Sequence, residues 1–137
     1  MPIIRIIEEG KLVITLLSGR VSHHELLHSF DELSKISPNL SELYELVINT
    51  HDLQVETSTQ MSQELTDKAA HVFNSFKRVA VSVVCPTDIA FGLARHFGMS
   101  LVNEKIDVAA FRTEDAARRW IDEARSLHSS VSSTYLT

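Results

Sequence analysis

Residues 78–98 read RVAVSVVCPTDIAFGLARHFG, and this stretch decides the fold class. Its first half is a valine-rich run with alternating positions, the pattern of a buried strand. Pro86 ends that run because proline cannot donate a hydrogen bond to a sheet ladder. Thr87 or Asp88 can then cap a helix, and Gly92 within it indicates close packing against a neighbouring element. Helical spacing predicts that this helix buries Ile89, Leu93 and Phe97.

The rest of the chain adds elements on both sides of this strand and helix. Alternating apolar patterns predict further strands at 3–7, 11–17, 44–49 and 105–111. Helical spacing and capping residues predict helices at about 23–36, from Thr57–Thr59 to about Lys77, and from Thr113 to Leu127. The turn at Glu8–Gly10 favours an antiparallel hairpin, and the break at residues 37–39 ends the first helix.

The order of elements is therefore β-β-α-β-α-β-α-β-α. Helices between successive strands favour parallel pairing with right-handed crossovers. We expect an α/β fold with a mainly parallel five-stranded sheet and helices mostly on one face. Each strand has one strongly apolar face and one weaker face, whereas a sheet covered on both sides reads as continuously apolar. We therefore expect a half-open sheet face that suits a partner, a second copy or a ligand.

Composition narrows the class of protein. The 137 residues are 44% apolar and 23% charged, as in a soluble globular chain, and we expect one domain at 1–127 with a polar, frayed tail at 128–137. No apolar run reaches the roughly 18 residues of a transmembrane segment. The single Cys85 excludes an internal disulfide, and with no signal peptide evident we expect a cytoplasmic protein. Basic residues are dispersed and the net charge is −5, which argues against nucleic-acid binding.

The order of elements resembles that of the STAS domain, typified by bacterial anti-sigma factor antagonists. Two segments are closer to the SpoIIAA-like proteins, which are related to STAS and to the Sec14/CRAL-TRIO lipid-binding fold. They are RVAVSVVCPTDIAFGLARHF at 78–97 and DVAAFRTEDAARRWI at 107–121. With the element order, the resemblance spans about residues 3–127. It implies a one-sided β/α superhelix that acts by protein contact rather than by catalysis.

The resemblance also implies a role for one serine. Anti-sigma factor antagonists carry a phosphorylated serine in an Asp-Ser-Ser-Gly-like motif at the start of the second helix. Counting from the third strand places Ser58 at that position, within Glu56-Thr57-Ser58-Thr59-Gln60. The acidic residue is displaced by one position and the glycine is missing. The alternative interpretation is that Ser58 is simply a helix cap.

The sequence His24-Glu25-Leu26-Leu27-His28 matches the zinc-hydrolase pattern HExxH. On a helix, the two histidines share a face and could bind zinc while the glutamate acts as general base. Catalytic zinc needs a third protein ligand, and the neighbouring sequence offers no obvious one. We therefore read this face as solvated and expect no metal or other cofactor, with a zinc hydrolase as a remote alternative.

A second cluster is expected at the carboxyl ends of the parallel strands, where α/β proteins bind ligands. A cysteine near a histidine and an aspartate suggests a nucleophile with its base, but a cysteine before proline is more often a small buried hydrophobe. We take this edge as a binding or regulatory surface. Its residues are Asn49, His51, Asp52, Thr57, Ser58, Cys85, Thr87 and Asp88.

Three functions therefore remain open. The first is a non-enzymatic STAS or SpoIIAA-like module that binds a protein partner or itself, as a possible homodimer. The second is a carrier of a small hydrophobic ligand or lipid, held under the second and third helices. Its pocket would be lined by Met61, Phe73, Phe76, Phe91 and Phe97. The third, remote, is the zinc hydrolase.

Overall fold

The computed structural model describes residues 3–8, 12–36, 41–56 and 58–136, with side chains described up to residue 127. The expectations for Glu9–Gly10, residues 37–39 and Thr57 lie outside these ranges. The strands are β1 (Ile3–Ile7), β2 (Leu12–Leu17), β3 (Arg20–Val21), β4 (Glu42–Asn49), β5 (Gln54–Val55), β6 (Arg78–Val84) and β7 (Ile106–Phe111). The helices are α1 (His23–Ser34), α2 (Thr59–Phe73), α3 (Asp88–Leu101) and α4 (Glu114–Leu136).

The main sheet has five strands in the order β1-β2-β4-β6-β7. β1 is antiparallel to β2, and every other neighbouring pair is parallel. The α/β class is confirmed, with a mixed sheet because the hairpin adds one reversed strand. The very short β3 and β5 were not predicted, and they pair in parallel as a separate two-stranded sheet. None of the described helices is long and apolar enough to cross a membrane.

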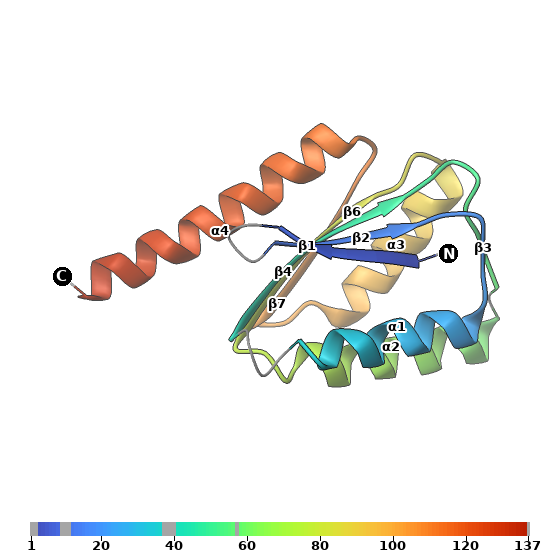
Figure 1. Ribbon diagram of the computed structural model, residues 1–137, viewed down its shortest axis with the longest axis horizontal. Coiled ribbons are helices and arrows are strands. Elements are labelled where there is room, and N and C mark those ends of the chain that lie inside the picture. The colour runs from blue at the N-terminus through green and yellow to red at the C-terminus, as the bar shows by residue number, and fades with distance from the viewer. Residues whose placement is uncertain (1–2, 9–11, 37–40, 57, 137) are drawn as a thin grey trace.

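Three helices cover one face of the main sheet and α4 covers part of the other (Figure 1). On the first face, Leu33, Phe73 and Leu101 from α1, α2 and α3 pack in one cluster with β-strand residues. On the second, Ala117 and Ile121 of α4 pack against Leu46 and Ala80. The helices therefore lie mostly on one face, as expected. The handedness rule applies to a helix between two parallel strands, and among the described residues α4 is not followed by a strand, so the rule does not fix its side.

The second sheet face is only half covered. α4 contacts β4, β6 and β7. On the same face, at the β1 edge, Ile4 is 45% exposed and Ile6 is 56% exposed. These side chains are the uncovered part of the half-open face that the sequence predicted.

The buried face of α3 differs from the prediction. Ile89 is 78% exposed and Leu93 is 56% exposed, whereas Phe97 packs against the core. The helix is apolar on two sides, so that spacing alone does not identify the buried one. The side of α3 that carries Gly98 and Leu101 packs on β7. The glycine on this side lets the helix approach the sheet more closely.

The close packing that the sequence predicted at Gly92 occurs at Gly98 instead. A Cβ atom on Gly92 would meet no heavy atom within 4 Å, so the expected packing contact is absent there. A Cβ atom on Gly98 would lie 3.0 Å from Val108 Cγ1 and 3.3 Å from Val108 Cβ. The close approach between α3 and β7 therefore depends on Gly98.

This contrast predicts opposite effects of one substitution. Gly92→Ala removes a helix-interior glycine at an open position and should raise the free energy of unfolding by about 0.5–1 kcal/mol. Gly98→Ala adds the same propensity but overpacks the contact with Val108, which typically costs about 1–3 kcal/mol. Urea unfolding followed by circular dichroism should therefore rank Gly92→Ala as the more stable variant. Equal stability of the two variants would contradict the packing described here.

Candidate functional site

Two of the predicted site residues meet at the carboxyl ends of β4 and β6. Asn49 Nδ2 donates to Cys85 Sγ at 3.6 Å, and the Cys85 backbone N–H donates to the carbonyl of Phe111 at 2.7 Å. Cys85 is fully buried. Burial raises the pKa of its thiol, against the smaller opposing effects of the Asn49 hydrogen bond and the Arg112 charge. The environment favours the neutral thiol, which is a poor nucleophile.

Thr87 and Asp88 lie beside this pair but serve the start of α3. The backbone N–H of Ala90 donates to Thr87 Oγ1 at 3.2 Å, which makes Thr87 the helix cap. Asp88 accepts from Arg112 Nη1 at 2.7 Å, and Arg112 Nη2 donates to the Pro86 carbonyl at 3.0 Å. Arg112 was not among the predicted site residues, although it directly follows the fifth predicted strand. It clamps the β6–α3 turn to the end of β7.

The remaining residues of the predicted surface lie on the segment from β4 to α2. His51 and Asp52 are exposed, and Thr50 Oγ1 donates to Asp52, which lowers the pKa of that carboxyl. Ser58 is exposed and caps α2, since its Oγ accepts from the Met61 backbone N–H at 3.1 Å. The β3–β5 pair holds this segment against the entry to α1.

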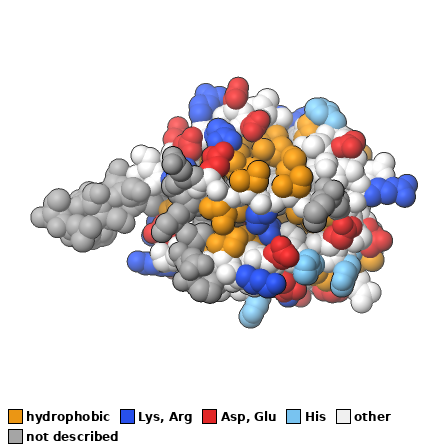
Figure 2. All heavy atoms as spheres, viewed as in Figure 1, with side chains coloured by type: hydrophobic (Ala, Val, Ile, Leu, Met, Phe, Trp, Pro, Cys, Tyr) orange, Lys and Arg blue, Asp and Glu red, His pale blue; other side chains and the backbone are white. Residues whose placement is uncertain are grey.

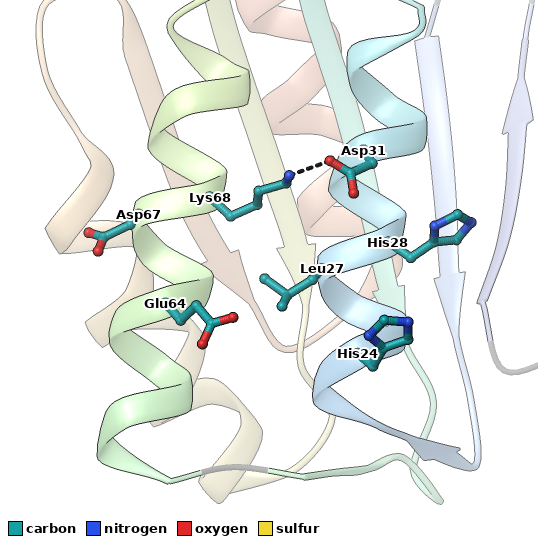
Figure 3. A pocket seen from close by; sticks show the side chains of 7 residues that line it. All are labelled: His24, Leu27, His28, Asp31, Glu64, Asp67 and Lys68. Atoms are coloured by element: carbon teal, nitrogen blue, oxygen red, sulfur yellow. Dashed lines mark ion pairs between the residues drawn. The ribbon is translucent and has the colours of Figure 1, made fainter.

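A hollow of about 440 Å³ lies between α1 and α2 (Figure 3). It contains both histidines of the HExxH sequence together with acidic side chains of α1 and α2. Lys68 reaches across it to pair with Asp31, and this hydrogen bond lowers the pKa of Asp31. The lining residues are His24, Leu27, His28, Asp31, Glu64, Asp67 and Lys68.

The residues of the HExxH sequence make local contacts on α1. Glu25 takes part in a capping box: it accepts from the Ser22 backbone N–H at 3.0 Å, which lowers its pKa, and donates its own N–H to Ser22 Oγ. His28 Nε2 lies 3.2 Å from Glu32. Within the described residues, no three histidine, cysteine or acidic side chains are arranged to hold a metal ion. The would-be general base is committed to the helix terminus instead.

The residues predicted to line an apolar pocket are used mainly for packing. Phe73 and Phe76 are 2% exposed and belong to the core, where Phe73 meets Phe30 edge to face. Phe97 packs against the same cluster. Phe91 lies under the guanidinium groups of Arg95 and Arg112, and Met61 is half-buried on α2. None of the five lines the hollow between α1 and α2.

A buried charged network is the feature that the sequence prediction missed. Glu45 of β4 is 4% exposed and accepts from Thr15 Oγ1 at 2.6 Å. Arg5 of β1 donates to Thr15 Oγ1 at 3.1 Å, lies 3.8 Å from Glu45, and donates to the carbonyl and hydroxyl of Ser29. Burial raises the pKa of Glu45, while the Arg5 charge and the Thr15 hydrogen bond oppose that change. The sequence did contain a signal for this network. Glu45 alternates with Leu43 and Val47, so strand periodicity places it on the same buried face of the strand as these two apolar residues.

The burial of Cys85 predicts slow thiol chemistry. Native protein should react with a chromogenic disulfide reagent at least about 100-fold more slowly than protein in urea, because reaction must wait for local opening. The measurement is the pseudo-first-order labelling rate with and without denaturant. Labelling of the native chain at the rate of a free thiol would show that Cys85 is accessible and would restore the nucleophile hypothesis.

The raised pKa of Glu45 predicts a pH-dependent stability difference. The folded chain binds the Glu45 proton more tightly than the unfolded chain, so stability is lost as pH rises through the folded-state pKa. The Glu45→Gln variant has no titratable carboxyl group at this position and serves as the reference. The free energy of unfolding of the wild type minus that of Glu45→Gln should therefore fall as the pH rises above about 4, the usual pKa of an unfolded-state glutamate. Urea unfolding at several pH values measures it, and a difference independent of pH would contradict the prediction.

Comparison with known proteins identifies the fold. No protein-family model and no curated protein sequence matches this chain. A similar solved structure is that of an uncharacterised protein of the DUF3478 family from Shewanella loihica PV-4, described as having a SpoIIAA-like fold. The two superpose with a TM-score of 0.60 at 12% sequence identity, over 87% of this chain and 91% of the other. The chain therefore has a SpoIIAA-like fold, as its resemblance to that group predicted.

Proposed function

We propose that this chain is a non-enzymatic, STAS-like regulatory module of the cytoplasm that acts by binding a protein partner. The observation that carries the proposal is the exposed apolar side of α3, formed by Ile89, Leu93 and Met99 and called here the α3 face. Met99 is 77% exposed, and the other two are more than half exposed. Ile89 and Leu93 are one helical turn apart, and Met99 lies further along the same helix. Exposed apolar side chains grouped on one element are costly in water and commonly mark interaction sites.

The shape of the α3 face supports a protein partner. Gly92 and His96 lie between its apolar side chains along the helix surface, and Gly92 has open space above it. A glycine there leaves a shallow notch into which a partner side chain can fit. Ile89 and Leu93 have the i, i+4 spacing of apolar anchors in helix-mediated recognition.

The polar residues at the start of α3 extend this surface. Asp88 and Arg112 form an exposed ion pair beside the first turn, next to the apolar face. Charged groups around an apolar patch set the orientation of a partner more than its affinity. The regulatory surface that the sequence suggested at Thr87 and Asp88 therefore continues along α3 in this proposal.

The surroundings of the two candidate catalytic residues support a non-enzymatic role. The Cys85 thiol is buried and the Glu25 carboxylate is engaged in a helix cap. A carrier of a hydrophobic ligand is the alternative that the exposed apolar face also allows. Native mass spectrometry of protein from its own host separates the two, since a carrier would show a bound mass that is lost on denaturation.

The test is a comparison of two charge substitutions at exposed leucines. Leu93→Glu places a carboxylate in the α3 face and should weaken partner binding at least about tenfold, the effect expected of a central interface residue. Leu127→Glu on α4 is the matched control, because Leu127 is 63% exposed and lies on a different helix. Both variants should keep wild-type stability to within about 0.5 kcal/mol.

The measurement is quantitative affinity purification from the native host with the wild type and both variants, followed by titration of the purified partner. The proposal expects a partner that the wild type and Leu127→Glu retain and Leu93→Glu loses. Equal retention of every partner by Leu93→Glu and the wild type would contradict docking on the α3 face.

A further inference from the structure

We propose that the β1 edge of the sheet is a site of homodimerisation, at which the β1 strands of two copies pair antiparallel about a two-fold axis at Arg5. β1 ends the strand order, and β2 is the strand with which it pairs. Figure 2 shows hydrophobic side chains gathered over this edge of the molecule. Ile4, Ile6 and Ile7 are each about half exposed there.

The hydrogen-bonding pattern shows which backbone groups of β1 face outward. The Glu8 N–H donates to the Leu12 carbonyl, so that Glu8 and Leu12 form a hydrogen-bonded pair. Such pairs alternate along an antiparallel ladder, and the register of β1 with β2 is continuous. The backbone N–H and C=O groups of Ile4 and Ile6 therefore form hydrogen bonds with β2. The N–H and C=O groups of Ile3, Arg5 and Ile7 point away from the sheet.

The sequence of β1 is self-complementary in this register. Ile3-Ile4-Arg5-Ile6-Ile7 reads the same in both directions. A two-fold axis at Arg5 pairs Ile3 with Ile7 of the second copy, Arg5 with Arg5, and Ile7 with Ile3. All outward-facing groups of the strand are then used, in about six hydrogen bonds. No other register of two copies pairs them all.

The side chains favour the same arrangement. Ile4 and Ile6 become directly opposed across the axis as close, non-hydrogen-bonded pairs. On their own sheet Ile4 lies beside Leu16 and Ile6 beside Ile14. Each row of side chains across the axis therefore runs from Leu16 through Ile4 of one copy to Ile6 and Ile14 of the second copy. The row crosses four strands and contains only leucine and isoleucine, on the face that α4 leaves open.

The charges at the edge are compatible with pairing. The Arg5 guanidinium is turned toward α1, where it donates to Ser29 and faces Glu45, so that two copies need not oppose free charges. Glu8 lies 3.6 Å from Arg118. Exposed edge strands are normally protected by lysine, proline, a bulge or other charged side chains. Residues 3–8 contain no lysine, proline or bulge, and their two charged side chains, Arg5 and Glu8, are paired within the chain. The edge fits a second copy of itself.

The first experiment is sedimentation equilibrium of the full chain over a concentration series. Wild-type protein should dimerise by about 200 µM, and Ile6→Lys, which adds a charge at the axis, should raise the dissociation constant at least about tenfold. Ile89→Lys, on the α3 face, is the control and should leave it unchanged. A monomeric wild type would overturn the proposal and leave the edge for a strand of another protein.

A second experiment tests the register. In a Cys85→Ser background, Ile4→Cys and Ile6→Cys chains mixed under oxidising conditions should form a 4–6 disulfide, because opposed non-hydrogen-bonded positions lie within disulfide range. Each chain alone should cross-link much less, since its two cysteines would be diagonal neighbours. A dimer without this preference, or one insensitive to Ile6→Lys, would overturn the proposed axis. Leu93→Glu should remain dimeric, which separates this site from partner docking on α3.

Discussion

The buried carboxylate of Glu45 is the constraint that fixes the β1 side of the sheet. A carboxyl group removed from water must have polar partners. Thr15 on β2 donates a hydrogen bond to it, and Arg5 on β1 lies 3.8 Å away as an ion-pair partner. Arg5 in turn donates to Ser29 of α1. One network therefore joins two strands of the parallel sheet, the antiparallel edge strand and the first helix. It also holds the Arg5 charge away from the free edge, which leaves that edge apolar.

The placement of α4 decides which apolar surface remains exposed. α1, α2 and α3 bury the stronger face of the sheet, whereas α4 packs on the weaker one over β4, β6 and β7, in a cluster that also includes Leu12 of β2. Ile4 and Ile6 are left in contact with solvent at the β1 edge. The α3 face is exposed for a related reason, since α3 packs on β7, the strand at the other end of the sheet. Two separate apolar surfaces at opposite ends of one sheet suit a module that makes two kinds of protein contact.

Residues that carry chemistry elsewhere are used here to stabilise the fold. Ser22, Ser58 and Thr87 each accept a hydrogen bond from the first turn of a helix. Glu25 completes one of these caps, and Arg112 holds the turn between β6 and α3. Sequence patterns alone cannot separate these roles from catalytic ones because the same side chains serve both. The decisive information is which atoms lie within hydrogen-bond distance.

The sequence by itself determined the order and types of the five strands of the main sheet and the four helices, and most of the caps, because these depend on periodicity and on residues a few positions apart. It also indicated that one sheet face would stay partly open. Only the tertiary structure decided that α4 lies opposite the other helices, that Gly98 rather than Gly92 makes the close contact, and that Ile89 and Leu93 face solvent. The partners of Glu45 are 30 and 40 residues away in the chain. Such contacts depend on which surfaces meet in three dimensions, and a local pattern specifies a face of a helix or strand but not the neighbour that it meets.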